Sequence, residues 1–426
     1  MDVITAVDQK KEAFLKGLDT ACKRPLAPAV VLAEARGFVD ALPVPTTRTE
    51  AWKYTRVARI VAMDLQHNDA AVDVAPYLLP VAADAARLVM VNGRFRADLS
   101  ILPKQAGIHV QPLEDALQAG LATGMGTLSN QEGDFFEAVN LAYAESGVFI
   151  RAAKGSIIEN PVYIVHLSSG QNAAAVSRTV IEVEERASLN VILHTVAVDG
   201  TTAFNSHVAE CFVGKNARLE IDKVQDEAGE VFQHATEWVA QERDSRFDIR
   251  TVTLRGAWVR NNLNVRINGE NCSTNLFGTY MPNGKELVDN HTMLDHRVPH
   301  CESNETYKGF LNDKSTGVFN GKVFVRQDAQ KTNAYQQNSN IVLSDDATMN
   351  AKPELEIYAD DVKCSHGSTT GQMDEEALFY LRARGLKQQT ARQLLVEAFV
   401  GEILAEISDE GVRDYCVARL HERAGA

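Results

Sequence analysis

A cysteine and a histidine two residues apart, Cys364 and His366, are the side chains whose types and spacing most readily suggest chemistry in this sequence. The residues around them are β-prone, and alternate side chains of a strand share a face, so the thiol and the imidazole should point the same way. A thiolate is a soft metal ligand and an imidazole is a borderline one. One chain supplies too few ligands here to hold a metal cluster. We therefore expect either packed structural residues or a site that a second chain completes.

A second group of metal-capable residues lies between positions 289 and 301. On a regular strand, His291 falls on one face, whereas His296 and His300 fall on the other. Imidazole, thiolate and carboxylate are usual ligands of iron or zinc, so these three histidines and Cys301 are candidate ligands. The interpretation we favour is simpler, with histidines that are buried and hydrogen-bonded beside a packed free thiol.

The elements around these residues change from strand to helix. Acidic residues at 374–376 suit a helix N-terminus, and Gly385 is a typical helix stop. The helical pattern continues to residue 426, and Leu395 and Phe399 belong to an apolar stripe with a spacing of four. So short a helical tail cannot form a large core alone. Its stripes must dock on the β region or on a partner.

Composition narrows the class of protein. The chain has 426 residues, 45% of them hydrophobic, and a net charge of −14, which disfavours a nucleic acid or an anionic membrane as partner. No run approaches the roughly 20 apolar residues of a membrane span. The six cysteines include no CxxC pair, and the first residues are charged and helical, unlike a signal peptide. We expect a cytoplasmic protein with free thiols.

Signatures of common enzymes are missing, including a Gly-rich phosphate loop, GxSxG, HExxH and a dinucleotide fingerprint. We therefore do not expect an enzyme. A carbohydrate-active β-helix enzyme is the alternative from another class, and it would need paired carboxylates in an exposed groove. No spacing of acidic residues selects such a pair.

Three regions follow from the pattern along the chain. Residues 1–150 are helical and mixed, with a hairpin at 88–95 that turns at an Asn-Gly pair. Residues 151–366 form strand after strand with short polar connections and no intervening helix pattern. Residues 367–426 are helical.

A weak repeat in the middle region predicts its architecture. A small residue opens a strand at Ala187, Ala217, Ser245 and Cys272, with spacings of 30, 28 and 27. A repeat of this kind suggests a solenoid, and an all-β solenoid of this size is most simply a parallel β-helix. A sandwich or a double barrel is the competing fold.

Several stretches resemble the SufB/SufD family of iron–sulfur cluster assembly proteins. The stretch around Cys364 and His366 carries most of the resemblance, and Arg48–Thr55 resembles the SufD branch, as does the chain length. The stretches are residues 289–303, 321–338, 360–371 and 379–385. The resemblance covers roughly residues 160–426.

The resemblance implies a right-handed parallel β-helix core flanked by N-terminal and C-terminal helical domains. It implies a scaffold subunit that pairs with a SufB-like chain and binds the ATPase SufC through its C-terminal helical domain, with SufE and SufS donating sulfur on the SufB side. His366 matches the histidine that the family implicates at the interface, and Cys364 matches the nearby cysteine. A transient iron–sulfur cluster would form with the partner, and none would stay bound to the isolated chain. A homodimer with a purely structural role is the alternative.

Overall fold

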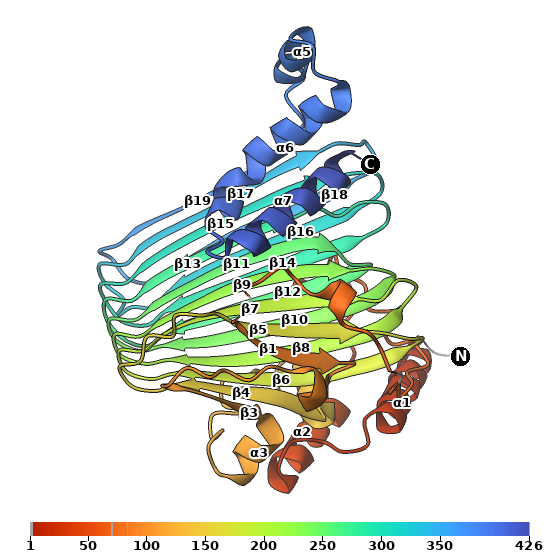
Figure 1. Ribbon diagram of the computed structural model, residues 1–426, viewed down its shortest axis with the longest axis vertical. Helices are drawn as coiled ribbons and strands as arrows, with labels where there is room; N and C mark the ends of the chain where they lie inside the picture. The colour runs from red at the N-terminus through yellow and green to blue at the C-terminus, as the bar shows by residue number, and fades with distance from the viewer. Residues whose placement is uncertain (1–2, 70, 83, 426) are drawn as a thin grey trace.

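The computed structural model describes residues 3–69, 71–82 and 84–425. It shows a parallel β-solenoid whose successive strands, from β4 onward, alternate between two sheets (Figure 1). The ten-stranded sheet has the order β19-β17-β15-β13-β11-β9-β7-β5-β1-β2, and the nine-stranded sheet has the order β18-β16-β14-β12-β10-β8-β6-β4-β3. From β4 to β19 each coil adds one strand to each sheet, so neighbours in a sheet are two strands apart in the chain, whereas β1 with β2 and β3 with β4 are antiparallel pairs at the first end. The solenoid prediction is confirmed and the sandwich alternative is wrong, whereas the right hand of the coil stays a prediction.

The strands of the ten-stranded sheet are β1 (Ala86–Val91), β2 (Arg94–Phe95), β5 (Val162–Ser168), β7 (Ser188–Ala197), β9 (Arg218–Glu227), β11 (Arg246–Arg255), β13 (Ser273–Tyr280), β15 (Glu302–Leu311), β17 (Asn333–Val342) and β19 (Lys363–Gly371). Those of the nine-stranded sheet are β3 (Ile108–Pro112), β4 (Ser146–Ala152), β6 (Ala173–Val183), β8 (Thr202–Val213), β10 (Glu230–Gln241), β12 (Trp258–Ile267), β14 (Leu287–His296), β16 (Thr316–Val325) and β18 (Thr348–Ile357). The helices are α1 (Val3–Ala21), α2 (Ala29–Ala41), α3 (Leu113–Gln118), α4 (Phe135–Tyr143), α5 (Glu375–Ala383), α6 (Gln388–Ala405) and α7 (Glu410–Gly425), with short 3-10 turns η1 (Glu50–Trp52), η2 (Ala75–Tyr77) and η3 (Ala97–Leu99).

One corner of the coil has the same construction in successive turns. A residue in the left-handed conformation, with φ between 57° and 62°, is followed by a small buried residue that directly precedes the next strand. The left-handed residue reverses the chain, and the small residue fits inside the bend. The pairs are Arg186-Ala187, Asn216-Ala217, Asp244-Ser245, Asn271-Cys272, His300-Cys301 and Lys331-Thr332. The repeat seen in the sequence is therefore this corner.

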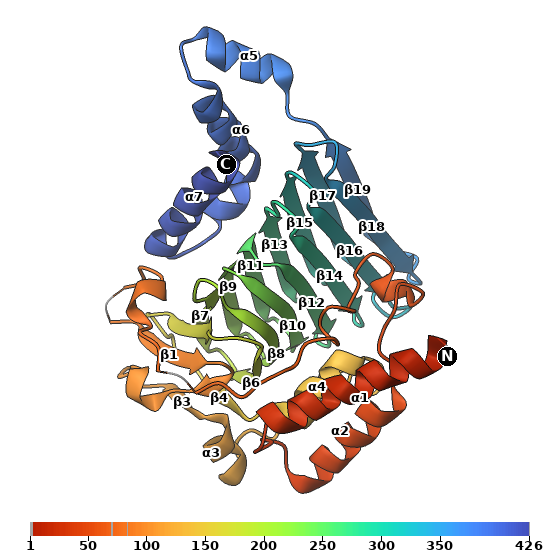
Figure 2. The ribbon, with the colours of Figure 1, turned by 90° about the vertical axis from the view of Figure 1, so that its right-hand side faces the viewer.

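Helices from the two ends of the chain cover opposite sheets (Figure 2). Helix α4 packs against β6 and β8 of the nine-stranded sheet, and α1 and α2 extend the same apolar cluster. Helices α6 and α7 pack against β11, β13 and β15 of the ten-stranded sheet, while α5 contacts α6 and stands clear of the strands. The helical N-terminal and C-terminal flanks are confirmed. The hairpin is confirmed as well, because β1 and β2 pair antiparallel around Asn92 and Gly93, both with positive φ.

Strands β1 to β4, between residues 86 and 152, extend the beginning of the two sheets. The division of the chain at residues 150 and 366 stays a prediction. Among the described helices, none combines the length and the apolar character that crossing a membrane requires.

Candidate metal-ligand site at the open end of the coil

Cys364 and His366 lie on β19, the last strand of the solenoid. Their register partners on β17 are Ala334 and Gln336, which are buried at 0% and 3% exposure. Side chains in register on parallel strands share a face, so Cys364 and His366 both point toward the interior of the coil. The last coil has no further coil above it, and the structure leaves His366 exposed and Cys364 half-buried. The two side chains therefore face the interior at its open end.

The edges of the last coil are unpaired in the described chain. Strand β18 is the outermost strand of one sheet and β19 is the outermost strand of the other. Most residues of β19 are exposed, and those of β18 are exposed or half-buried. Exposed edges of this kind are templates for pairing with another chain. This end of the solenoid therefore presents free strand edges in both sheets.

The surroundings of Cys364 disfavour the thiolate form of its side chain in the isolated chain. Its side chain packs against the interior core, and this burial raises the pKa of the thiol above its ordinary value, although the backbone of Ala334 lowers it in part. Burial disfavours the charged form of a thiol. A metal ion or a cation from a partner would favour ionisation.

The earlier histidine group is not brought together by the fold. Strand β14 ends at His296, so the expectation that His296 and His300 share a strand face is wrong. His296 points into the coil, and its Nε2 lies 2.9 Å from the Ser303 hydroxyl. Burial lowers the pKa of His296 to about 4, so its ring is neutral. His300 is an exposed corner residue, and Cys301 is the buried small residue of the same corner.

His291 lies on the outer face of β14 beside Asp289, which has no exposed surface. Asp289 Oδ1 lies 2.9 Å from His291 Nε2, and Asp289 Oδ2 accepts hydrogen bonds from Arg260 at 2.6 Å and Thr55 at 2.5 Å. Burial would raise the pKa of Asp289, but Arg260 and His291 outweigh burial and hold it well below its usual range. This cluster attaches the N-terminal segment to the sheet.

Trp52, next to that cluster, is part of the same attachment. Its indole is 4% exposed, stacks on Trp258 with ring centroids 6.4 Å apart, and has the Arg260 guanidinium 4.3 Å from its centroid. The Arg48–Thr55 stretch thus packs as a cap on the nine-stranded sheet. Within the described residues, no three His, Cys, Asp or Glu side chains lie close enough together to hold a metal ion.

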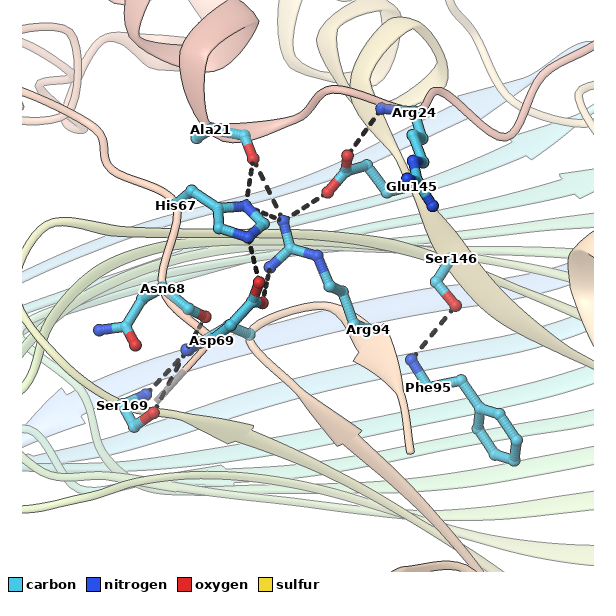
Figure 3. A network of polar contacts seen from close by, with 11 residues as sticks. Ala21, Arg24, His67, Asn68, Asp69, Arg94, Phe95, Glu145, Ser146 and Ser169 are labelled. Carbon is cyan, nitrogen blue, oxygen red and sulfur yellow. Dashed lines mark hydrogen bonds and ion pairs between the residues drawn. The ribbon is translucent and has the colours of Figure 1, made fainter. Parts of the chain in front are cut away.

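Sequence reasoning missed a hollow in the N-terminal region, where distant segments meet (Figure 3). Arg94 donates to Glu145 at 2.5 Å and to the Ala21 carbonyl at 3.1 Å, and His67 is paired with Asp69. These contacts tie the end of α1 to β2 and to the residue before β4. No spacing in the sequence indicates these contacts, because their members are up to 124 residues apart.

Sequence reasoning also missed a buried polar column beneath His366. Glu305 on β15, Gln336 on β17 and His366 on β19 occupy successive register positions on the interior face. Gln336 Nε2 donates to Glu305 Oε2 at 2.7 Å. Glutamate and glutamine are polar, so their residue types in the sequence do not indicate that Glu305 and Gln336 are buried. Only the strand register shows that they lie beneath His366.

Apolar side chains on the outermost helix are uncovered. Phe379 is 72% exposed and Tyr380 57% exposed on α5, and Leu394 of the neighbouring α6 is 42% exposed. Large apolar side chains that cluster on a projecting helix mark an interaction surface more often than isolated ones do.

Known proteins resemble this chain over most of its length. The profile described as "SUF system FeS cluster assembly, SufBD core domain" matches residues 166–399. Iron-sulfur cluster assembly protein SufD of Escherichia coli is 32% identical over 395 residues, which is 89% of each chain. An iron-sulfur cluster assembly SufBD family protein of Synechocystis is 31% identical over 88% of this chain and 86% of its own length. The chloroplastic protein ABCI7 of Arabidopsis thaliana is 31% identical over 78% of this chain and 72% of its own.

Proposed function

Because the chain belongs to the SufBD family of iron–sulfur cluster assembly proteins, we propose that it is a scaffold subunit on which a nascent cluster forms. The cluster is the cargo of the assembly, and the chain does no chemistry of its own beyond supplying ligands. His366 is the principal ligand from this chain and Cys364 is the second. The observation that carries the proposal is the position of His366, which is exposed on the interior face of the last strand.

A SufB-like chain is the proposed partner at the open end. The unpaired edges of β18 and β19 would continue across the interface into the sheets of a second solenoid. That pairing would complete the ligand set, since one imidazole and one thiol are too few to hold a cluster. Sulfur from SufE and SufS would arrive on the partner's side.

A SufC-like ATPase is the proposed partner of the C-terminal helices. The exposed Phe379 and Tyr380 supply an apolar surface on α5, which projects away from the strands. Because α5 follows β19 after three residues, movement of this helix by the ATPase would be transmitted to the strand that carries His366. The free cysteines suit a reducing compartment such as the cytosol.

The test is anaerobic co-purification with the SufB-like and SufC-like partners, followed by iron and sulfide analysis. We expect His366→Ala to lower the iron and sulfide content severalfold while the complex still elutes intact. His300→Ala, which removes an exposed histidine at a corner, is the matched control and should change nothing. Phe379→Ser should release the ATPase, whereas Ile157→Ser, which removes a 70% exposed side chain at the other end, should not.

Unchanged cluster yield in His366→Ala would refute the ligand role. If the double variant of Cys364 and His366 also keeps full yield, the chain is a structural module, and a homodimer in the absence of the SufB-like chain would support that second candidate.

A further inference from the structure

One buried oxygen atom beneath His366, Gln336 Oε1, has no hydrogen-bond partner among the described residues, and Gln336 is 3% exposed. Buried polar atoms in folded proteins are satisfied with few exceptions, and an exception calls for a physical reason. Here the atom belongs to the column that leads to His366.

The orientation of the Gln336 amide is fixed by its neighbour. The amide nitrogen of Gln336 donates to Glu305 Oε2, which lies 2.7 Å away. Burial raises the pKa of Glu305 to about 7, so at and above neutral pH its ionised form, which only accepts hydrogen bonds, holds the amide nitrogen on this side. The amide oxygen is then directed away from Glu305. A donor is what the oxygen lacks, and the residue in register with Gln336 on the next strand is His366. An imidazole N–H is such a donor.

The opposite sheet leaves room for this amide. Gly321 lies on the interior face of β16, and a Cβ atom there would lie 2.4 Å from Gln336 Nε2 and 2.6 Å from the Phe319 ring. Any side chain at position 321 would displace the amide from Glu305. The glycine therefore keeps Gln336 in the position that the hydrogen bond to Glu305 requires.

We propose that Gln336, held by Glu305 and given room by Gly321, positions the imidazole of His366 for metal ligation. One ring nitrogen of His366 donates its hydrogen to Gln336 Oε1 after a rotation of the exposed side chain. The other nitrogen then keeps its lone pair and faces the open end, where the partner's ligands arrive. Residues that accept a hydrogen bond from a ligating histidine fix its tautomer and ring orientation in this way. Gln336 and Glu305 are positioning residues, because they act through His366. The metal part of this inference rests on the proposed function.

A measurement on the isolated chain tests the positioning directly. The chain is labelled with ¹⁵N-histidine, and the His366 ring signals, assigned by their loss in His366→Ala, report which nitrogen carries the hydrogen. We expect one tautomer to dominate in the unmodified chain and the ratio to shift toward that of a free imidazole in Gln336→Leu. Glu305→Gln keeps an acceptor oxygen for the Gln336 amide nitrogen and should preserve the preference. Gln337→Leu, next to Gln336 on the outer face, is the matched control and should change nothing.

Gly321→Ala gives a second perturbation, which removes no polar group from the chain. It should shift the tautomer ratio in the same direction as Gln336→Leu, since it displaces the amide. In the anaerobic complex, Gln336→Leu should lower iron content at limiting iron about 10–100-fold, the range typical of such supporting residues.

The outcomes separate the two proposals. If His366→Ala leaves iron and sulfide unchanged, the ligand role fails, and the tautomer measurement still decides whether Gln336 positions the ring. If His366→Ala abolishes cluster formation but Gln336→Leu changes neither the tautomer ratio nor the iron content, the positioning role is overturned. If Gln336→Leu shifts the tautomer ratio but leaves the iron content unchanged, Gln336 has no role in cluster assembly, and the proposal is overturned as well.

Discussion

Replacing Asp226 with asparagine should release helix α7 from the solenoid. Asp226 lies on the outer face of β9, and its carboxylate accepts hydrogen bonds from Tyr415 at 2.6 Å and from Arg419 at 2.9 Å, both on α7. Arg255 of β11 is a third donor. Burial would raise the pKa of Asp226, but Arg419 and Tyr415 outweigh it and lower the pKa, so the group is charged at neutral pH.

The expected magnitude follows from the burial of this cluster. The carboxylate is 1% exposed, and the two arginines are 29% and 23% exposed. Removing one member of a buried ion pair costs about 3–5 kcal/mol, and the partly solvated arginines favour the lower end. At about 1.4 kcal/mol per factor of ten, a loss of about 3 kcal/mol raises the population of the open helix about 100-fold.

Hydrogen exchange followed by mass spectrometry measures this directly. Peptides from α7 should exchange about 100-fold faster in Asp226→Asn, while peptides from the interior strands keep their protection. Asp414→Asn, which changes an exposed carboxylate on the same helix, should leave exchange unchanged. An increase below about 5-fold in α7, or an equal increase in the strands, would show that this cluster does not hold the helix.

Two further predictions concern stability. Burial lowers the pKa of His194 and of His296 to about 4, so the unfolded chain binds protons between pH 6.5 and 4 that the folded chain does not. The free energy of unfolding should therefore fall as the pH drops through that interval, by about 3 kcal/mol per histidine. The midpoint of denaturant unfolding should depend less steeply on pH in His296→Asn. A midpoint of the unmodified chain that stays constant from pH 7 to 4 would contradict this. Glu210 accepts hydrogen bonds from three backbone amides and from Arg178, which is 1% exposed, so Glu210→Gln should cost about 3–5 kcal/mol of unfolding free energy in denaturant titrations. A loss below about 1 kcal/mol would refute that reasoning.

The coil could be predicted because its corner is a local feature. A left-handed residue followed by a small one needs particular side chains, and those side chains recur in the sequence at Ala187, Ala217 and Ser245. The same rule explains Cys301, which sequence reasoning treated as a candidate ligand. It stands where other coils have alanine or serine, and its burial follows from the bend.

The supporting residues of the candidate site could not be predicted because they are defined by register alone. Gln336 and Glu305 are 31 residues apart and touch only because successive coils stack in phase. Likewise, the outer face of β14 looks polar in the sequence, yet Asp289 is buried by Thr55 and Arg260. A contact between distant segments leaves no periodic signal in either of them.

The packing of Trp52 and Thr55 on the nine-stranded sheet determines when this segment can fold during synthesis. Thr55 hydrogen-bonds to Asp289, which is 234 residues later in the chain. At a synthesis rate of about 5–20 residues per second, the segment emerges roughly 10–50 s before Asp289 does. During that interval the indole of Trp52 can meet Phe136, His234 and Trp258 as they are made, but the hydrogen bond of Thr55 cannot form before β14 exists.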